Sequence, residues 1–223
     1  MRILSQMLPR SFRHRLRNSF DSLYSRALPD KVTLGVLSQW TIATRTVHQN
    51  AIIYSGGVGE DISFEQELVR RYGVKIHVFD PSPVATNTIE TANLDALVFK
   101  PVGLAASSTA KFSVGGGTGA GTWLKAGSGQ SLACTNIASE MAVNGHDFID
   151  LLKIDIEGFE YEVLEGCLAE QLSIKQLCVE FHDFFPEISR AKTTNMIRAL
   201  QSRGFHLIHR HRHDHTFLHQ SAL

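Results

Sequence analysis

The chain lacks a net charge, a paired arrangement of cysteines and a long hydrophobic run. Its 22 lysines and arginines balance 22 aspartates and glutamates, so the overall charge does not indicate nucleic acid or an acidic membrane as a partner. Cys134, Cys167 and Cys178 are widely spaced without a CxxC pair, which disfavours a disulfide framework and predicts a reducing, cytoplasmic location. No segment is long and apolar enough for a membrane span or a signal peptide, so we expect a soluble protein.

The charges are nevertheless unevenly distributed, because residues 1–31 are distinctly basic. Apolar residues recur between the arginines at helical spacing over residues 3–27, which predicts an amphipathic helix interrupted near Pro9. We expect residues 1–38 to form a basic helical extension and residues 39–223 to form one catalytic domain. Packing on the flank of the domain is the simplest role for this helix, and weak contact with a membrane or another protein is the alternative.

From residue 51 onward, segments typical of strands alternate with segments typical of helices. The last two strands follow each other with only a turn at 212–215 between them, which predicts an antiparallel hairpin. The fold class is therefore α/β, with a mostly parallel sheet that ends in an antiparallel hairpin. The predicted strands cover residues 51–55, 74–79, 96–103, 148–154, 176–181, 205–210 and 216–219, and the predicted helices cover 63–72, a segment ending near 93, 137–143, 159–168 and 191–203.

Residues 115–129 are unusually rich in glycine, a composition that disfavours a regular element. No Gly-Lys-Ser/Thr sequence ends this run, so it is not typical of a phosphate-binding P-loop. We expect a mobile loop, either a lid or a disordered insert.

Histidines alternate near the C-terminus, at positions 209, 211, 213 and 215. Such alternation places imidazoles on one face of a strand, where they could bind zinc. Because the predicted turn at 212–215 interrupts that strand, we favour a solvated hairpin.

Polar side chains follow three of the predicted strands at the point where each strand ends. A glycine turn occupies residues 56–59, Asp80 follows the second strand, and Asp155 and Glu157 follow the apolar strand that ends at Ile154. In a Rossmann-like site, glycines let a ligand approach the backbone and an acid after the second strand binds the ribose hydroxyls. Acids beside the glycine turn, at positions 60 and 61, disfavour a pyrophosphate but are compatible with a cationic sulfonium ligand.

These segments resemble the S-adenosylmethionine-dependent methyltransferases of the FkbM type over about residues 40–219. The most specific similarity is LKIDIEGFE at 152–160 followed by VLEG at 163–166, and VFDPSP at 78–83 and VEFH at 179–182 are also similar to family motifs. The resemblance implies a seven-stranded Rossmann-like sheet and S-adenosylmethionine as the cofactor.

The resemblance also implies roles for individual residues. The glycine turn is expected to contact the methionine part of the cofactor and Asp80 to bind its ribose. Many methyltransferases carry an acid near the end of the first strand, where this chain has Ile53 or Tyr54, and Glu60 or Asp61 is a candidate substitute. The expected cofactor-binding residues are Ser55, Gly56, Gly57, Gly59, Asp61, Asp80, Pro81 and Asp155.

Transfer of a methyl group to an alcohol requires the oxygen to lose its proton, so a positioned base is expected. His182 is the candidate, because it follows a buried strand and lies beside Glu180. We expect His182, Asp155 and Glu180 to be catalytic, and Glu157 and His182 to bind the substrate. No metal ligand is assigned, although Asp155 and Glu157 could instead hold Mg²⁺.

The sequence therefore predicts a methyltransferase that O-methylates a hydroxyl of a small molecule or sugar and does not act on nucleic acid. A metal-dependent nucleotide-sugar glycosyltransferase is one alternative, since its Asp-x-acid motif is similar to Asp155 and Glu157. A catalytically silent module that binds partners through the basic helix is the other.

Overall fold

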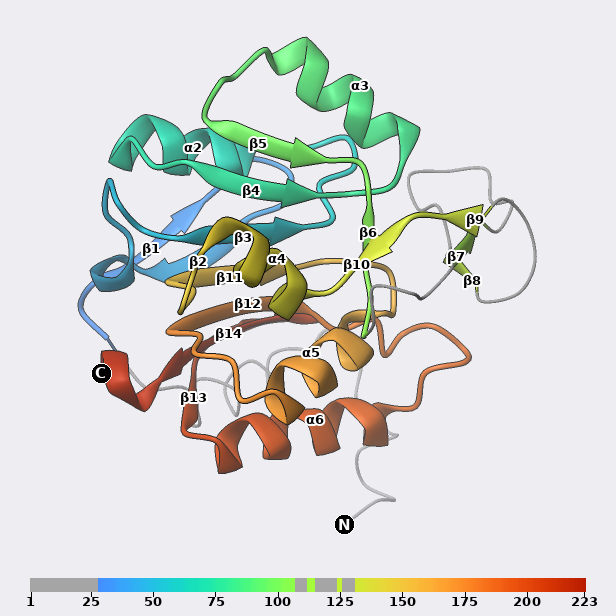
Figure 1. The fold of residues 1–223 in the computed structure, drawn as a ribbon. Helices are drawn as coiled ribbons and strands as arrows, with labels where there is room; N and C mark the ends of the chain where they lie inside the picture. The colour runs from blue at the N-terminus through green and yellow to red at the C-terminus, as the bar shows by residue number, and fades with distance from the viewer. Residues whose placement is uncertain (1–27, 107–111, 115–123, 126–130) are drawn as a thin grey trace, which may run out of the picture.

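A computed structural model describes residues 28–106, 112–114, 124–125 and 131–223. The helix predicted over residues 3–27 lies outside this range, as does most of the predicted glycine-rich loop. Seven strands form the central sheet in the order β13-β14-β12-β11-β3-β4-β5, as Figure 1 shows from bottom to top. The strands are β3 Ile53–Gly56, β4 Ile76–Phe79, β5 Leu97–Lys100, β11 Leu151–Ile154, β12 Gln176–Glu180, β13 Phe205–His211 and β14 Asp214–His219.

The pairing within this sheet confirms the predicted α/β architecture. The five strands from β12 to β5 are parallel to their neighbours, whereas β14 pairs antiparallel with both β12 and β13. Parallel strands require crossover helices, and each predicted helix of the domain is present at nearly its predicted position. These helices are α2 Ser63–Tyr72, α3 Pro83–Ala92, α4 Ile137–Asn144, α5 Glu160–Ala169 and α6 Arg190–Ser202.

The helices cover both faces of the sheet and bury two hydrophobic clusters. Alternate strand residues point to opposite faces, so Ile53 and Leu151 belong to one cluster while Tyr54 and Leu152 belong to the other. The first cluster lies under α2 and α3, and the second lies under α4, α5 and α6. Burial on both faces explains why the strand segments read as continuous apolar runs.

A short hairpin that the sequence did not indicate also packs on the sheet. Strands β1 Lys31–Leu34 and β2 Trp40–Ala43 pair antiparallel, and η2 Thr44–Thr46 follows them. The hydroxyl of Thr216 donates to the Thr41 carbonyl at 2.7 Å, and the Ala43 amide donates to the Gln176 side chain at 2.6 Å. These bonds attach β2 to the central sheet, although β1 lies within the segment assigned above to the 1–38 extension.

The connection between β5 and α4 contains short strands, of which one, β8, falls within the loop predicted over residues 115–129. Strands β6 Gly103–Leu104 and β10 Cys134–Thr135 pair in parallel, and β7 Phe112–Val114 pairs with β8 Leu124–Lys125 and β9 Ser131–Leu132. The predicted irregular loop over 115–129 is therefore wrong at β8, because pairing with β7 stabilises a strand there despite the flanking glycines.

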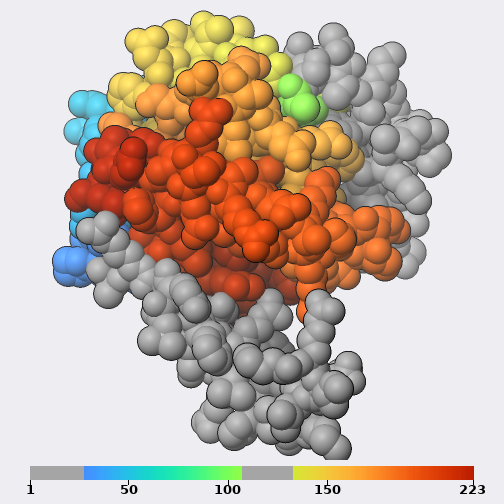
Figure 2. All heavy atoms as spheres, turned by 90° about the horizontal axis from the view of Figure 1, so that it is seen from below, coloured from blue at the N-terminus to red at the C-terminus, as the bar shows by residue number. Residues whose placement is uncertain are grey.

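The C-terminal hairpin turns over Arg212 and His213 alone, a shorter turn than predicted. Strand β14 is largely buried between β12 and β13, so the expectation of a solvated hairpin is wrong for this strand. Figure 2 shows this end of the molecule from below, with α6 and the C-terminal strands in orange to red, and η3 Gln220–Ala222 ends the chain.

Two further expectations concern chemistry rather than topology. In the part of the chain that the structure describes, none of the three cysteines forms a disulfide. Among those same residues, no helix combines the length and apolar character that a membrane crossing needs.

Candidate functional site

The candidate site lies at the sheet edge formed by the carboxyl ends of β3, β4, β11 and β12. Strand β4 follows β3 on one side, whereas β11 lies against β3 on the other, so the direction of chain progression reverses between β3 and β11. Ligands of open α/β sheets bind at such a switch point. The antiparallel strand β14 begins at the same edge, with Asp214.

The glycine turn of residues 56–59 has one position that only glycine can occupy. Gly57 has φ +76°, and a Cβ atom there would lie 1.7 Å from the carbonyl oxygen of Asp155. Its amide donates to the Phe79 carbonyl at 2.9 Å, which holds the turn against the end of β4. At Gly59, with φ +49°, a Cβ atom would meet no other atom within 4 Å, so the backbone there is open to a ligand.

Asp80 is bound to this turn through both of its carboxylate oxygens. Oδ2 accepts hydrogen bonds from the amides of Val58 at 2.8 Å and Gly59 at 3.0 Å, and Oδ1 accepts from the Ser82 amide at 2.8 Å. The side chain is buried, and Pro81 connects it to the start of α3. Because Oδ1 carries only one of these bonds, it keeps a position for a further donor such as a ribose hydroxyl.

Asp61 is placed differently from the prediction that it binds the cofactor. Its carboxylate accepts from the Ser38 amide at 2.7 Å and the Ser63 amide at 2.9 Å, which connects the β1–β2 loop to the start of α2. Burial acts to raise the pKa of Asp61, but these backbone hydrogen bonds lower it overall. The structure thus shows Asp61 joining the β1–β2 loop to the start of α2.

Ser55 also faces inward, into a buried polar network. Its hydroxyl donates to Glu65 at 2.6 Å, and both side chains are almost fully buried. Lys153, equally buried on the neighbouring strand, donates to the Gly57 carbonyl. Burial raises the pKa of Glu65, while the charge of Lys153 opposes this change. The Ser55 side chain is therefore bonded to helix α2, and Lys153 is bonded to the glycine turn. Sequence reasoning assigned no role to Glu65 or Lys153.

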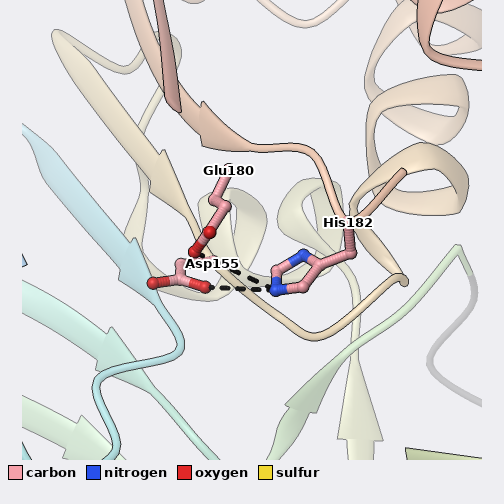
Figure 3. Close-up of side chains that lie close together, drawn as sticks. All are labelled: Asp155, Glu180 and His182. Atoms are coloured by element: carbon pink, nitrogen blue, oxygen red, sulfur yellow. Dashed lines mark ion pairs between the residues drawn. The ribbon is translucent and has the colours of Figure 1, made fainter. Parts of the chain in front are cut away.

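The predicted catalytic and substrate residues come together at the ends of β11 and β12. We call Asp155, Glu157, Glu180 and His182 the carboxylate–histidine cluster. Nε2 of His182 lies 3.5 Å from Glu157 Oε2, 3.8 Å from Asp155 Oδ1 and 3.9 Å from Glu180 Oε2. Figure 3 shows three of these side chains facing one another. The structure thus gathers residues that are separated in sequence, as predicted from their strand ends.

Glu160 holds the imidazole of His182 in place and was not assigned a role from the sequence. One oxygen of this fully buried carboxylate accepts from the backbone amide of His182 at 2.8 Å and lies 2.9 Å from its Nδ1. Its other oxygen accepts from the Gly158 amide at 2.8 Å. Glu160 is the second glutamate of the Ile-Asp-x-Glu-Gly segment, so that motif contained a signal for this contact.

Crowding of acids shifts several pKa values in the cluster. Burial and the charge of Asp155 raise the pKa of Glu180 to about 8, against an opposing effect of His182. Burial likewise raises the pKa of Glu157, and burial together with Asp155 raises that of the adjacent Asp214 to about 6. Shifts of this kind are typical of functional sites.

The pKa of His182 changes its expected role. Burial acts to lower this pKa, but the hydrogen bond and charge of Glu160, with the charges of Glu180 and Asp155, raise it to about 9. The imidazole therefore carries a proton at neutral pH in this form of the protein. His182 is therefore a cation within the cluster at neutral pH, whereas the predicted role as a base requires a neutral imidazole.

Two aromatic side chains flank the cluster. The rings of Phe184 and Phe185 lie 5.2 and 4.9 Å from that of His182. Phe185 is buried, whereas Phe184 is 51% exposed and offers an apolar surface beside the charged groups. The site thus combines hydrogen-bond acceptors with one apolar wall.

The alternating C-terminal histidines do not form a comparable group. His213 Nδ1 lies 2.9 Å from Asp183, and His215 is buried with Nδ1 at 2.7 Å from the His213 carbonyl. Within the described residues, no group of three metal-ligand side chains includes them. The imidazoles of His213 and His215 therefore face different partners.

Comparison with known proteins finds similarity to methyltransferases. The family described as "Methyltransferase FkbM domain" matches residues 49–207. A human protein described as "Probable methyltransferase-like protein 24" is 25% identical over 185 residues, which cover 77% of this chain and 45% of that protein. The chain thus spans less than half the length of this curated relative.

A structural comparison finds a fibrillarin pre-rRNA processing protein of Methanococcus jannaschii. The similarity covers 86% of this chain and 83% of that one, with 9% identity and a TM-score of 0.44. A similarity at this level carries no argument about function.

Proposed function

The chain belongs to the FkbM methyltransferase family, whose cofactor is S-adenosylmethionine, and from this premise we propose that it methylates a hydroxyl of a small molecule or sugar. The observation that carries the proposal is the carboxylate–histidine cluster. It lies at the same sheet edge as the glycine turn and contains a carboxylate with a raised pKa, Glu157. A carboxylate of this kind suits proton removal from an alcohol.

The residues at this edge fit a cationic cofactor. When bound, S-adenosylmethionine supplies a methyl group on a positively charged sulfur. Gly59 leaves the backbone open, and Asp80 Oδ1 keeps a free acceptor position for a ribose hydroxyl. Asp155, the member of the cluster whose backbone lies against Gly57, places negative charge beside the glycine turn, which favours a sulfonium and disfavours the pyrophosphate of a nucleotide sugar.

Glu157 is the residue we assign as the base. Its side chain is 33% exposed, so an acceptor can reach it, and burial of the remainder raises its pKa. Its backbone has φ +55°, a left-handed conformation that is uncommon outside glycine and that recurs at functional sites. Its carboxylate lies 3.5 Å from the His182 imidazole, where it accepts the hydroxyl proton.

His182 and Phe184 complete the acceptor site. The protonated imidazole lies 3.5 Å from Glu157, so its charge stabilises negative charge that develops on the acceptor oxygen. The exposed ring of Phe184 supports the apolar face of a sugar or small molecule. Hydrogen-bond acceptors next to an apolar wall are suited to a polyhydroxylated acceptor.

The proposal is tested by following labelled methyl groups from S-adenosylmethionine to a panel of sugars and small alcohols. We expect Glu157→Gln to lower kcat by about 10²- to 10⁴-fold, the usual contribution of a positioned acid or base. The matched control is Glu162→Gln, a change of an exposed glutamate on the neighbouring helix α5. Methylation of nitrogen or carbon acceptors only, or equal rates in the two variants, would contradict the proposal.

A further inference from the structure

Three side chains of the carboxylate–histidine cluster place ligand atoms around one point. A carboxylate oxygen of Asp155, a carboxylate oxygen of Glu180 and a ring nitrogen of His182 all lie within 4.8 Å of one another. Figure 3 shows them reaching the same space from the ends of β11 and β12. Over the described parts of the chain, this is the one group of three such side chains.

The buried imidazole is oriented toward this point by a residue outside the group. Glu160 binds Nδ1 and the backbone amide of His182, which leaves Nε2 directed at Asp155 and Glu180. His182 is 2% exposed, and its Nε2 lies 3.5–3.9 Å from carboxylate oxygens of Glu157, Asp155 and Glu180. A carboxylate behind the far nitrogen of a histidine is the arrangement that orients metal-binding histidines in proteins.

The spacing is too long for hydrogen bonds but suits coordination. The oxygens of Asp155 and Glu180 lie 3.8 and 3.9 Å from His182 Nε2. Bonds of about 2.0–2.2 Å from one ion to nitrogen and oxygen ligands place neighbouring ligand atoms roughly 3–4 Å apart. An ion can therefore reach all three atoms with little movement of the side chains.

The excess of acidic over basic side chains at this point also favours the binding of a cation. Asp155, Glu157 and Glu180 face the single imidazole of His182 at this point. The ammonium group of Lys153 lies 3.9 Å from Asp155 but donates its hydrogen bond to the Gly57 carbonyl. Acids in a partly buried site are stabilised when a cation neutralises their charge.

We propose that Asp155, Glu180 and His182 bind a divalent cation, which displaces the proton from Nε2 of His182, with Glu160 as the positioning residue behind the histidine. Two carboxylates and one imidazole form a mixed ligand set that suits Mn²⁺ better than the softer ions preferred by thiolates. Three protein ligands leave coordination positions open. An acceptor hydroxyl can occupy one of them and ionise more easily there, a role that rests on the proposed function although ion binding does not.

The test is titration of Mn²⁺ into the full chain after EDTA treatment, without S-adenosylmethionine, with free Mn²⁺ followed by electron paramagnetic resonance. We expect one ion per chain. Asp155→Asn and Glu180→Gln should each weaken binding about tenfold or more, and Glu160→Gln should weaken it about 10- to 100-fold by releasing the imidazole. The control Glu162→Gln should bind as the wild type does, since this glutamate is exposed on α5.

Failure of the wild type to bind Mn²⁺ at millimolar concentration would overturn the proposal, as would unchanged affinity in both Asp155→Asn and Glu180→Gln. Anomalous diffraction from a crystal soaked in Mn²⁺ gives a result that does not depend on the folding of variants. A peak between Asp155, Glu180 and His182 supports the site, and a peak only elsewhere overturns it. Mn²⁺ binding without methylation of any hydroxyl would contradict the proposed function alone.

Discussion

The ends of β3 and β4 carry acidic side chains, as do the ends of β11 and β12, but the two sets differ in their hydrogen bonding. Asp61 and Asp80 each accept bonds from backbone amides and connect segments of the fold. Glu157 and Glu180 instead face other acids and a cationic histidine, and both have raised pKa values. The first set stabilises a binding surface, whereas the second holds carboxyl groups that keep a proton more readily than ordinary ones.

This difference separates two tasks within one edge of the sheet. A cofactor must be held in a defined place, which requires a rigid turn and satisfied backbone groups. Proton removal requires a group that can change its charge, and crowded acids with raised pKa values have that property. Predictions that target each set separately should therefore give different results.

The largest effect is expected at the glycine turn. In Gly57→Ala, the added methyl group meets the Asp155 carbonyl at 1.7 Å in a backbone conformation that disfavours alanine. We expect a loss of about 4 kcal/mol or more in the free energy of unfolding, measured by chemical denaturation. Gly59→Ala, in open space, should cost only about 1 kcal/mol. Similar losses in both variants would contradict the account of the turn.

Removal of the Asp80 charge should weaken both stability and cofactor binding. Asp80→Asn replaces an acceptor oxygen with a donor beside amides that need an acceptor. We expect each quantity to fall by about 1–3 kcal/mol, the scale of hydrogen bonds to a charged group. Denaturation and calorimetry measure them separately. A variant with unchanged stability would remove Asp80 from the set that supports the fold.

Removal of the Glu180 charge should increase stability, whereas removal of the Asp80 charge should decrease it. Burial and Asp155 make ionisation of Glu180 unfavourable in the folded state. Glu180→Gln should therefore raise the free energy of unfolding of the metal-free protein by about 1–2 kcal/mol, while methyl transfer falls. Thermal melts at pH 8 in EDTA give the comparison. Destabilisation as large as in Asp80→Asn would show that the two sets are not distinct.

The stability of the metal-free protein should also depend gradually on pH. The pKa of His182 is about 9 in the folded state against an ordinary value of 6.5, so the folded state retains this proton over a range where the unfolded state loses it. This contribution is complete below pH 6.5 and is lost as pH rises through 9. The raised pKa of Glu180, about 8 against 4.5, acts in the same direction over its own range.

Melting temperatures of the metal-free protein should therefore fall from pH 6.5 to pH 9. In Glu180→Gln the decrease should be shallower, because one of the two groups is gone. A melting temperature that rises over this interval would contradict the pKa shifts.

The fold was predictable from sequence because its elements carry strong local patterns. The strand that ends at Ile154 is wholly apolar apart from Lys153, and helix α2 ends at Gly73, which adopts the left-handed conformation expected of a terminating glycine. The β1–β2 hairpin was not predicted, since each strand has only four residues and depends on contacts with distant Thr216 and Gln176. Such contacts leave no periodic signal.

The site was predictable in its location but not in its charge states. Strand ends placed Asp155, Glu180 and His182 together, and the structure shows them in contact distance. The protonation of His182 depends on Glu160, which lies at the start of α5 and is fully buried. A single sequence does not reveal how a side chain is surrounded, so the histidine was interpreted as a base. The hydrogen bonds of Ser55 and Asp61 were not predictable for the same reason, because their partners come from other elements.

The most direct test of this division is calorimetric titration of S-adenosylmethionine into the wild type, Asp80→Asn and Glu157→Gln. The account predicts that the wild type binds S-adenosylmethionine and that Asp80→Asn binds it about tenfold more weakly, or weaker still. Glu157→Gln should bind it nearly as the wild type does, since Glu157 acts on the acceptor. A wild type that does not bind S-adenosylmethionine, or equal affinity for it in Asp80→Asn and the wild type, would contradict the account.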